Sequence, residues 1–229
     1  MIIKKLSEKI ERHFLAQQFS QKQSADLKHF EQIFPNFEQE LAISVNRLKD
    51  DYDYYIKNVS IGNSAVSIET AALIDMIVRK NKVQRILDLG SGFSSFVFRQ
   101  YQKDVSIQVE VTSIDADTKW LKKTEKYLAQ NGLNTDSLHH WHYFTKNFDG
   151  QFDLIFVDMR PVSARVEWAE RLQKSLTKSG VMLIDDVHKV HLIAPLLKIY
   201  KKHMNELLNL KKITKDGLGR YALLVLPKI

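Results

Sequence analysis

From about residue 66 onward, short apolar runs alternate with amphipathic helical segments, and this alternation is the feature that most restricts the possible fold. Four runs have the length and character of buried strands: RILDLG (85–90), VEVTSID (109–115), FDLIFVD (152–158) and VMLID (181–185). Helices are expected over 67–80, from Ser94 or Ser95, over 117–131, over 167–176 and from near Pro195. Strand–helix repeats of this kind build parallel sheets, because parallel neighbours need a long crossover. We therefore predict an α/β fold with helices on both faces of the sheet.

The two ends of the chain follow other patterns. Residues 1–60 show helical apolar spacing, interrupted at Pro35, and no strand signal, so we expect a helical N-terminal extension before a domain over 61–229. DDYDYYIKNVSIGNS (50–64) is expected to be a loop that carries three tyrosines, and LHHWHYF (138–144) is a further candidate strand. Near the end, LLNLKKIT and YALLVLP flank the turn KDGLG, a pattern typical of an antiparallel hairpin.

Composition excludes several classes of protein. The 229 residues include no cysteine, which excludes disulfide scaffolds, thiolate metal sites and cysteine nucleophiles. No apolar run approaches the ~18 residues of a membrane span, and the first segment lacks the apolar core of a signal peptide. We therefore expect a cytoplasmic protein.

The net charge of +7 is concentrated in the last part of the sequence. Residues 187–229 hold eight lysines and one arginine against two acids, so the first 186 residues are balanced. Such a region is either a lysine-covered helix and hairpin or a docking face for nucleic acid, an anionic membrane surface or an acidic substrate.

Acidic residues end four of the predicted strands. They are Asp88, Asp115, Asp158 and the pair Asp185 and Asp186. Open α/β sheets bind their ligands at the carboxyl ends of the strands, so these carboxylates are expected to meet at one site. Charged side chains avoid burial unless they are paired or bind a metal, and we therefore predict that this edge is functional.

The turn DLGSGFSS (88–95) has the composition of a ligand-binding loop. Gly90 and Gly92, with Ser91 between them, let the backbone approach a ligand, and the following helix offers free N–H groups. The third glycine of a dinucleotide motif is absent, so the turn alone is a weak indication. Asp115 lies 23 residues beyond Gly92, at the end of the next strand, where a carboxylate can bind both hydroxyls of a ribose.

In combination, ILDLGSGFSS, the acidic strand end VTSID and FDLIFVD resemble motifs of the class I S-adenosylmethionine-dependent methyltransferases, over about residues 60–229. The resemblance implies a Rossmann-like, doubly wound sheet of seven strands in the order 3-2-1-4-5-7-6, with an antiparallel last hairpin. It also implies that S-adenosylmethionine binds over the first two strands. The residues expected to contact this cofactor are Asp88, Gly90, Ser91, Gly92, Asp115, Tyr143 and Asp158, with Tyr143 on the adenine side.

Within that class, FVDMR (156–160) and LIDDVHK (183–189) are most similar to the catechol O-methyltransferase and caffeoyl-CoA group. The resemblance places Asp158, Asp185 and Asp186 at the metal-ligand positions of the group. Three carboxylates suit octahedral Mg²⁺, which would orient the acceptor hydroxyl and lower its pKa. A second possibility is that Asp158 is an acid close to the cofactor, as in metal-free methyltransferases.

The sequence also departs from that group. The lysine base of the group would fall on Pro161, which cannot serve. Arg160 stays protonated and is expected to bind an anionic acceptor. His188 is then the candidate base, because its ordinary pKa near ~6.5 suits proton transfer. The alternative is that His188 is a surface histidine at the start of a basic helix.

These observations predict methyl transfer from S-adenosylmethionine to a small-molecule acceptor, most simply to a hydroxyl oxygen. One alternative is an RNA or protein methyltransferase that docks through the basic region 187–229. Another is a cofactor-binding module without catalysis. The apolar helix faces in residues 1–60 must be buried, on the sheet domain or against a second subunit. We expect them to cover the active-site edge and to shape the acceptor pocket, and a homodimer through these helices stays open.

Overall fold

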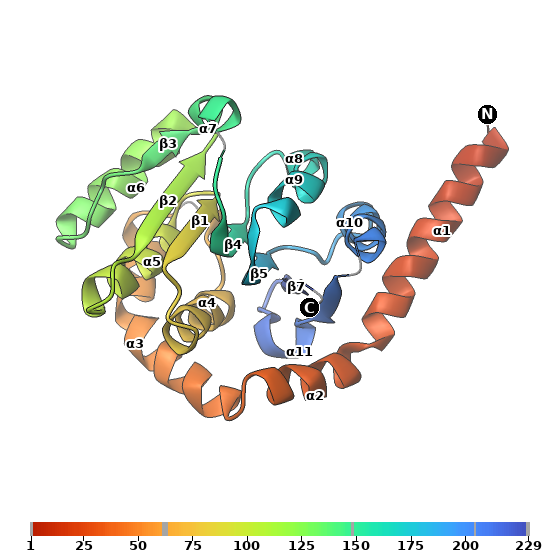
Figure 1. Cartoon of the computed structure of the whole chain (residues 1–229), viewed down its shortest axis with the longest axis horizontal. Coiled ribbons are helices and arrows are strands. Elements are labelled where there is room, and N and C mark those ends of the chain that lie inside the picture. Colours follow the sequence, from red (N-terminus) through yellow and green to blue (C-terminus); the bar gives the residue numbers. More distant parts are fainter. Residues whose placement is uncertain (1, 61–63, 148, 204, 228–229) are drawn as a thin grey trace.

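A seven-stranded sheet forms the centre of the computed structural model, which describes residues 2–60, 64–147, 149–203 and 205–227 (Figure 1). The strands are β1 (Arg85–Leu89), β2 (Glu110–Asp115), β3 (Leu138–His140), β4 (Phe152–Val157), β5 (Leu176–Ile184), β6 (Glu206–Asn209) and β7 (Leu223–Leu226). Their order is β3-β2-β1-β4-β5-β7-β6. Strands β1 to β5 are parallel, and β7 runs antiparallel to both β5 and β6. The predicted order and the antiparallel last hairpin are confirmed.

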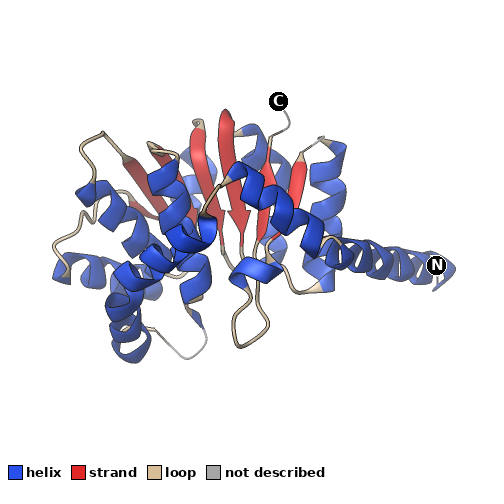
Figure 2. Cartoon of the chain, turned by 90° about the horizontal axis from the view of Figure 1, so that it is seen from below, coloured by secondary structure: helices blue, strands red, loops and turns tan. Residues whose placement is uncertain are grey.

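Helices cover both faces of this sheet (Figures 1 and 2). They are α1 (Ile2–Gln21), α2 (Gln23–Ile33), α3 (Phe37–Asn58), α4 (Ile68–Lys80), α5 (Phe93–Asp104), α6 (Thr118–Gln130), α7 (Trp141–Asn147), α8 (Val162–Glu167), α9 (Ala169–Lys174), α10 (Val190–Lys202) and α11 (Lys211–Thr214). In β1, Ile86 packs in the core shared with α3 to α6, whereas Leu87 and Leu89 pack in the core shared with α7 to α10. This alternation is what a strand buried on both faces requires.

Two predicted helix starts are confirmed by their capping bonds. The Ser67 hydroxyl accepts a hydrogen bond from the backbone N–H of Thr70 at 3.2 Å. The Asp117 carboxylate accepts from the N–H groups of Lys119 and Trp120 at 2.8 and 3.2 Å. Both bonds satisfy N–H groups that the first turn of a helix leaves free. The second cap fixes the start of α6 directly beyond the end of β2.

The prediction of a loop over 50–64 was wrong for most of that run. Helix α3 continues to Asn58, and residues 61–63, where the expected boundary between extension and domain falls, lie outside the described residues. The helix continues because Tyr55 is fully buried, with its ring 5.3 Å from that of Phe93 and 4.9 Å from that of Tyr127. Burial of an aromatic side chain outweighs the weak helix propensity of a tyrosine-rich run.

Other element boundaries also differ from the predictions. The strand expected over 138–144 ends at His140, and α7 begins at Trp141. The helix expected over 167–176 is the shorter α9, which is preceded by α8, a helix that was not predicted, and β5 already begins at Leu176. Helix α10 begins at Val190, so Pro195 lies inside it. The run LLNLKKIT is strand only to Asn209, beyond which α11 follows.

The N-terminal helices lie against three different parts of the domain. Helix α3 packs on α4, α2 on β6 and α1 along α10. Helix α1 extends past the sheet edge toward the N-terminus (Figures 1 and 2). It leaves Leu6, Ile10 and Phe14 more than half exposed. In the described part of the chain, no helix has both the length and the apolar character needed to cross a membrane.

Candidate functional site

The glycine-rich turn follows β1 and lies directly beside the end of β4. Gly90 has a φ of +111°, and a Cβ atom there would lie 2.7 Å from the carbonyl carbon of Asp158. The backbones come so close because the Asp158 N–H donates to the Leu89 carbonyl at 2.7 Å and the Gly90 N–H to the Ile114 carbonyl at 2.8 Å. Only glycine combines this φ with this approach. The turn is therefore held between the ends of β2 and β4.

Asp88 lies beneath this turn and is fully buried. Its carboxylate accepts hydrogen bonds from the hydroxyls of Ser94, Ser95 and Ser113, at 2.9, 2.5 and 2.8 Å. Burial raises its pKa to about 6, although the three hydroxyls and the nearby Arg99 oppose the rise. These bonds tie β1 to β2 and to the start of α5. Asp88 thus fixes the shape of the turn through buried hydrogen bonds.

Asp115 ends β2 and connects the turn to α6. One carboxylate oxygen accepts from the N–H and hydroxyl of Ser91 at 2.9 and 3.2 Å, and the other from the N–H of Asp117 at 2.9 Å. Burial raises its pKa, and these hydrogen bonds to the ionised form oppose the rise. The indole N–H of Trp120 donates to the Ser91 carbonyl at 2.6 Å. Asp115 and Trp120 therefore hold Ser91 from two sides.

Two acidic positions follow β4 and β5. Asp158 accepts a hydrogen bond from the guanidinium of Arg165 at 2.6 Å. Burial raises the pKa of Asp158, the Arg165 charge lowers it and the neighbouring Asp186 raises it. Asp185 is only 3% exposed, and burial together with the Asp158 and Asp186 charges raises its pKa to about 8. Burial and the two neighbouring acids thus favour the neutral form of Asp185.

Asp186 is the second residue after β5 and has a φ of +57°. One of its oxygens is buried without a hydrogen-bond partner and lies 4.0 Å from His188 Nδ1 and 3.9 Å from Arg220 Nε. Arg220 also donates to Asp216 at 2.6 Å and to the Ala65 carbonyl at 3.1 Å. Burial lowers the pKa of His188, and the Asp186 charge opposes this. Asp186 therefore lies between a histidine and a guanidinium.

One cavity of about 540 Å³ connects the turn with these acids, and its size is that of a typical small-molecule site. It is lined by Ser64, Gly90, Ser91, Asp115, Ala116, Asp117, Trp120, Asp158, Arg160, Pro161, Asp186 and Arg220. Six residues predicted from the sequence, on the turn and on three strand ends, thus share one cavity. The predicted meeting of strand-end acids at one edge is seen for Asp115, Asp158 and Asp186.

Five other predicted residues do not line this cavity. Asp88, Gly92 and Asp185 lie behind its wall. Tyr143 is 52% exposed on α7, and its ring stacks on His139 at 4.4 Å rather than on the cavity wall. His188 lines a separate groove of about 460 Å³ together with His13 and other residues. The direct contacts expected of Asp88, Gly92 and Tyr143 with a cofactor stay a prediction.

The geometry does not support the predicted Mg²⁺ site at Asp158, Asp185 and Asp186. Among the described side chains, no group of three or more histidines and acids is placed to hold a metal ion. Asp185 is buried away from the cavity, and Asp158 faces the Arg165 guanidinium. A positive group already hydrogen-bonded to the first carboxylate repels a cation. We derive no step of the reaction through a metal.

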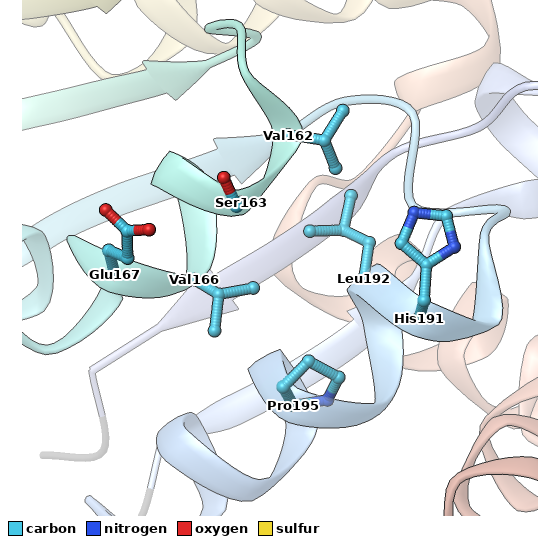
Figure 3. A pocket seen from close by; sticks show the side chains of 7 residues that line it. All are labelled: Val162, Ser163, Val166, Glu167, His191, Leu192 and Pro195. Carbon is cyan, nitrogen blue, oxygen red and sulfur yellow. The ribbon is translucent and has the colours of Figure 1, made fainter. Parts of the chain in front are cut away.

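A second groove, of about 500 Å³, lies between α8 and α10 (Figure 3). It is lined by Val162, Ser163, Val166, Glu167, His191, Leu192 and Pro195. Glu167 and His191 lie on opposite sides of it, so they form no catalytic pair (Figure 3). The strand-end acids do not line this groove, and the larger cavity is therefore the candidate active site.

Three residues of the site have weak or no sequence signals. Trp120 lies three residues beyond the helix cap Asp117, so the predicted cap already places it in the first turn of α6. Arg220 follows Asp216 by four residues, directly after the predicted turn KDGLG of the hairpin. Arg165 has the sequence context of an ordinary surface residue on a helix, yet it is 2% exposed. Its role depends on tertiary packing alone.

The fold and the cavity at the carboxyl edge define an α/β protein with a small-molecule cavity lined by three strand-end acids. The sequence matches the family model described as "Methyltransferase domain" over residues 80–221, and the chain belongs to this family. No curated protein that was compared is similar enough in sequence to match.

Solved structures share the fold. An O-methyltransferase of Bacillus cereus in complex with S-adenosylhomocysteine is 14% identical to this chain, with a TM-score of 0.56. The match covers 91% of this chain and 99% of the Bacillus cereus chain. An O-methyltransferase of Streptomyces achromogenes bound to S-adenosylmethionine has 14% identity, with coverages of 92% and 99% and a TM-score of 0.56. A Staphylococcus aureus structure described as of the caffeoyl-CoA O-methyltransferase kind has 18% identity, coverages of 87% and 96%, and a TM-score of 0.53.

Proposed function

We propose that this chain transfers the methyl group of S-adenosylmethionine to a hydroxyl oxygen of a small-molecule acceptor. The observation that carries the proposal is the single cavity in which the glycine-rich turn and Asp115 lie at one end and Asp158, Arg160 and Asp186 at the other. Membership of the methyltransferase family and the O-methyltransferase names of similar folds support it. Action in the cytoplasm stays a prediction.

The cofactor end uses residues of β1, β2 and α6. When bound, S-adenosylmethionine supplies a methyl group on a positively charged sulfur. We assign the ribose hydroxyls to Asp115, because its carboxylate reaches the cavity and is already oriented by Ser91 and Asp117. The Gly90 backbone lets the ligand approach closely, and the indole of Trp120 offers a flat apolar wall.

The acceptor end uses the loops after β4 and β5. Arg160 is exposed on the cavity wall and binds an anionic group of the acceptor. Asp186, which lines the cavity, accepts the hydroxyl proton while the oxygen–carbon bond forms and the carbon–sulfur bond breaks. His188, 4.0 Å away, accepts the proton from Asp186 and releases it to solvent. Asp158 orients the acceptor.

Formation of S-adenosylhomocysteine from S-adenosylmethionine and a panel of hydroxylated small molecules tests the proposal. Acceptors with a carboxylate or phosphate are expected to react fastest, and Arg160→Met should raise their KM. Asp186→Asn should lower kcat by roughly 10²–10⁴-fold, with His188→Ala lowering it less. Asp149→Ala, an exposed carboxylate outside the cavity, is the matched control. The assignment would be overturned if no hydroxylated small molecule were methylated and RNA or protein were methylated instead, only at low salt.

A further inference from the structure

The carboxyl ends of β4 and β5 are joined by one buried side chain. Arg165, on α8, is 2% exposed, and its guanidinium donates three hydrogen bonds. Nε donates to the Met159 carbonyl at 2.9 Å, Nη1 to the Asp185 carbonyl at 2.7 Å and Nη2 to the Asp158 carboxylate at 2.6 Å. Two of these acceptors follow β4 and the third follows β5, so a single planar group spans both strand ends.

Burial of this guanidinium is consistent with its contacts. A buried charge is costly unless it is paired and hydrogen-bonded, and Arg165 has one carboxylate and two carbonyl partners. The rigid fork of donors also restricts how the strand ends can move relative to each other. The side chain is therefore an internal part of the site and not a surface arginine that happens to be covered.

Arginines face both acids of the acceptor end. Asp158 pairs with Arg165, and Asp186 lies 3.9 Å from Arg220 Nε. Both acids line the cavity. A divalent cation that bridged them would bind a carboxylate whose other oxygen already accepts from Arg165, and it would lie against a like charge. The positive charge that acids at such a position require is thus supplied by the chain itself.

We propose that the Arg165 guanidinium occupies the place of a divalent cation between the ends of β4 and β5, so that this chain needs no metal and Arg165 is the positioning residue for Asp158. The proposal rests on the methyl transfer proposed above. Arg165 also holds the acids of the acceptor end in position without a bound metal ion. Arg165 touches neither cofactor nor acceptor, because it lies behind Asp158 and does not line the cavity.

A titration of the full chain with Mn²⁺, followed by electron paramagnetic resonance, tests the proposal without any turnover. We expect the Asp158→Asn variant to bind as much Mn²⁺ as the wild-type chain does, because the guanidinium already occupies the position that a cation would take. Asp158→Asn lowering Mn²⁺ binding would overturn the proposal. This measurement stays decisive even if no acceptor is found, so it separates failure of this inference from failure of the proposed function.

Removal of the guanidinium should instead increase Mn²⁺ binding. Arg165→Met that still binds S-adenosylhomocysteine should gain Mn²⁺ binding, and a second substitution, Asp158→Asn, should abolish the gain. A folded Arg165→Met variant that gains none would contradict the proposal. Arg12→Met, at an exposed arginine of α1, is the control for a general change in charge. If Arg165→Met fails to bind S-adenosylhomocysteine, the wild-type titration decides.

The positioning role has its own readout. Arg165→Lys keeps the charge but cannot reach three acceptors, so kcat should fall roughly 10- to 100-fold while affinity for S-adenosylhomocysteine stays unchanged. Chelation with EDTA should leave the wild-type rate unchanged. A lysine variant with normal kcat, or a wild-type rate that EDTA abolishes and Mg²⁺ restores, would overturn the inference. A purely structural role would instead lower cofactor binding and kcat together.

Discussion

Asp115 is the residue whose contacts most directly connect fold and cofactor. Asp115→Ala should remove two charge-assisted hydrogen bonds to a ribose, each worth about 1.5–3 kcal/mol, and lower the affinity for S-adenosylhomocysteine by at least a hundredfold. The loss should exceed that of Trp120→Phe, which keeps the flat wall but removes the bond to the Ser91 carbonyl. Calorimetric titration measures both variants. Unchanged affinity in Asp115→Ala would exclude this carboxylate as the ribose partner.

Asp88 gives a prediction about pH and stability. Its pKa is raised to about 6 from an ordinary value of 3.8, so the folded state binds a proton that the unfolded state has released between these values. The contribution of Asp88 to stability must then fall as pH rises from about 4 to about 6 and stay level above, by roughly 3 kcal/mol in total. In Asp88→Asn this fall should be absent. Urea unfolding of both proteins at several pH values checks the difference, and parallel curves would contradict it.

At the scale of elements, local signals explain which predictions succeeded. The starts of α4 and α6 were predictable because Ser67 and Asp117 form caps with their own first turns. The central strands were predictable because they are short, apolar on both faces and end in acids. The end of α3 and the start of α7 depend on packing between distant segments, such as Tyr55 on Phe93, which no local pattern contains.

The residues of the site also differ in whether a local sequence pattern could predict them. The turn and Asp115 could be predicted, because glycines and a spaced acid carry their chemistry in the sequence. The metal prediction is not supported, because it took three acids as a set, and only the folded chain shows that Asp185 is buried and that Arg165 donates to Asp158. Charge balance at a site is a property of its tertiary surroundings, and residues next to each other in sequence do not determine it.

The close approach of β1 and β4 leads to a prediction for a matched glycine pair. Gly90→Ala places a Cβ 2.7 Å from the Asp158 backbone at a φ of +111°, so β1 and β4 must separate. We expect a loss of about 3 kcal/mol or more in unfolding free energy and loss of cofactor binding. In Gly217→Ala nothing lies within 4 Å of the new Cβ, and the change should be within about 0.5 kcal/mol. Thermal unfolding compares the two, and equal losses would contradict the argument.

At the scale of the whole molecule, the N-terminal helices connect distant parts of the chain. Buried residues of α2 and α3, among them Phe30, Leu48 and Tyr55, belong to the same core as α4 and α5. Helix α1 instead lies beside α10, where Glu11 pairs with Lys198 at 2.7 Å, and its His13 shares a groove with His188. The part of the extension described here does not line the larger cavity, so its predicted role as a cover over the acceptor remains a prediction.

Helix α1 carries the last prediction, that two copies of the chain associate. Leu6, Ile10 and Phe14 recur every four residues and are 57%, 62% and 57% exposed, so they form one exposed apolar stripe along α1. A contiguous stripe of this kind is typical of an interface, and an antiparallel pair of α1 helices would bury it symmetrically. Sedimentation equilibrium should therefore give a dimer. Changing all three residues to glutamate should give a monomer that still binds S-adenosylhomocysteine, because none of them lines the cavity. The control is Ile43→Glu, at an apolar residue of α3 that is also exposed, which should leave the dimer intact. A wild-type monomer at all concentrations would show that the stripe serves another purpose.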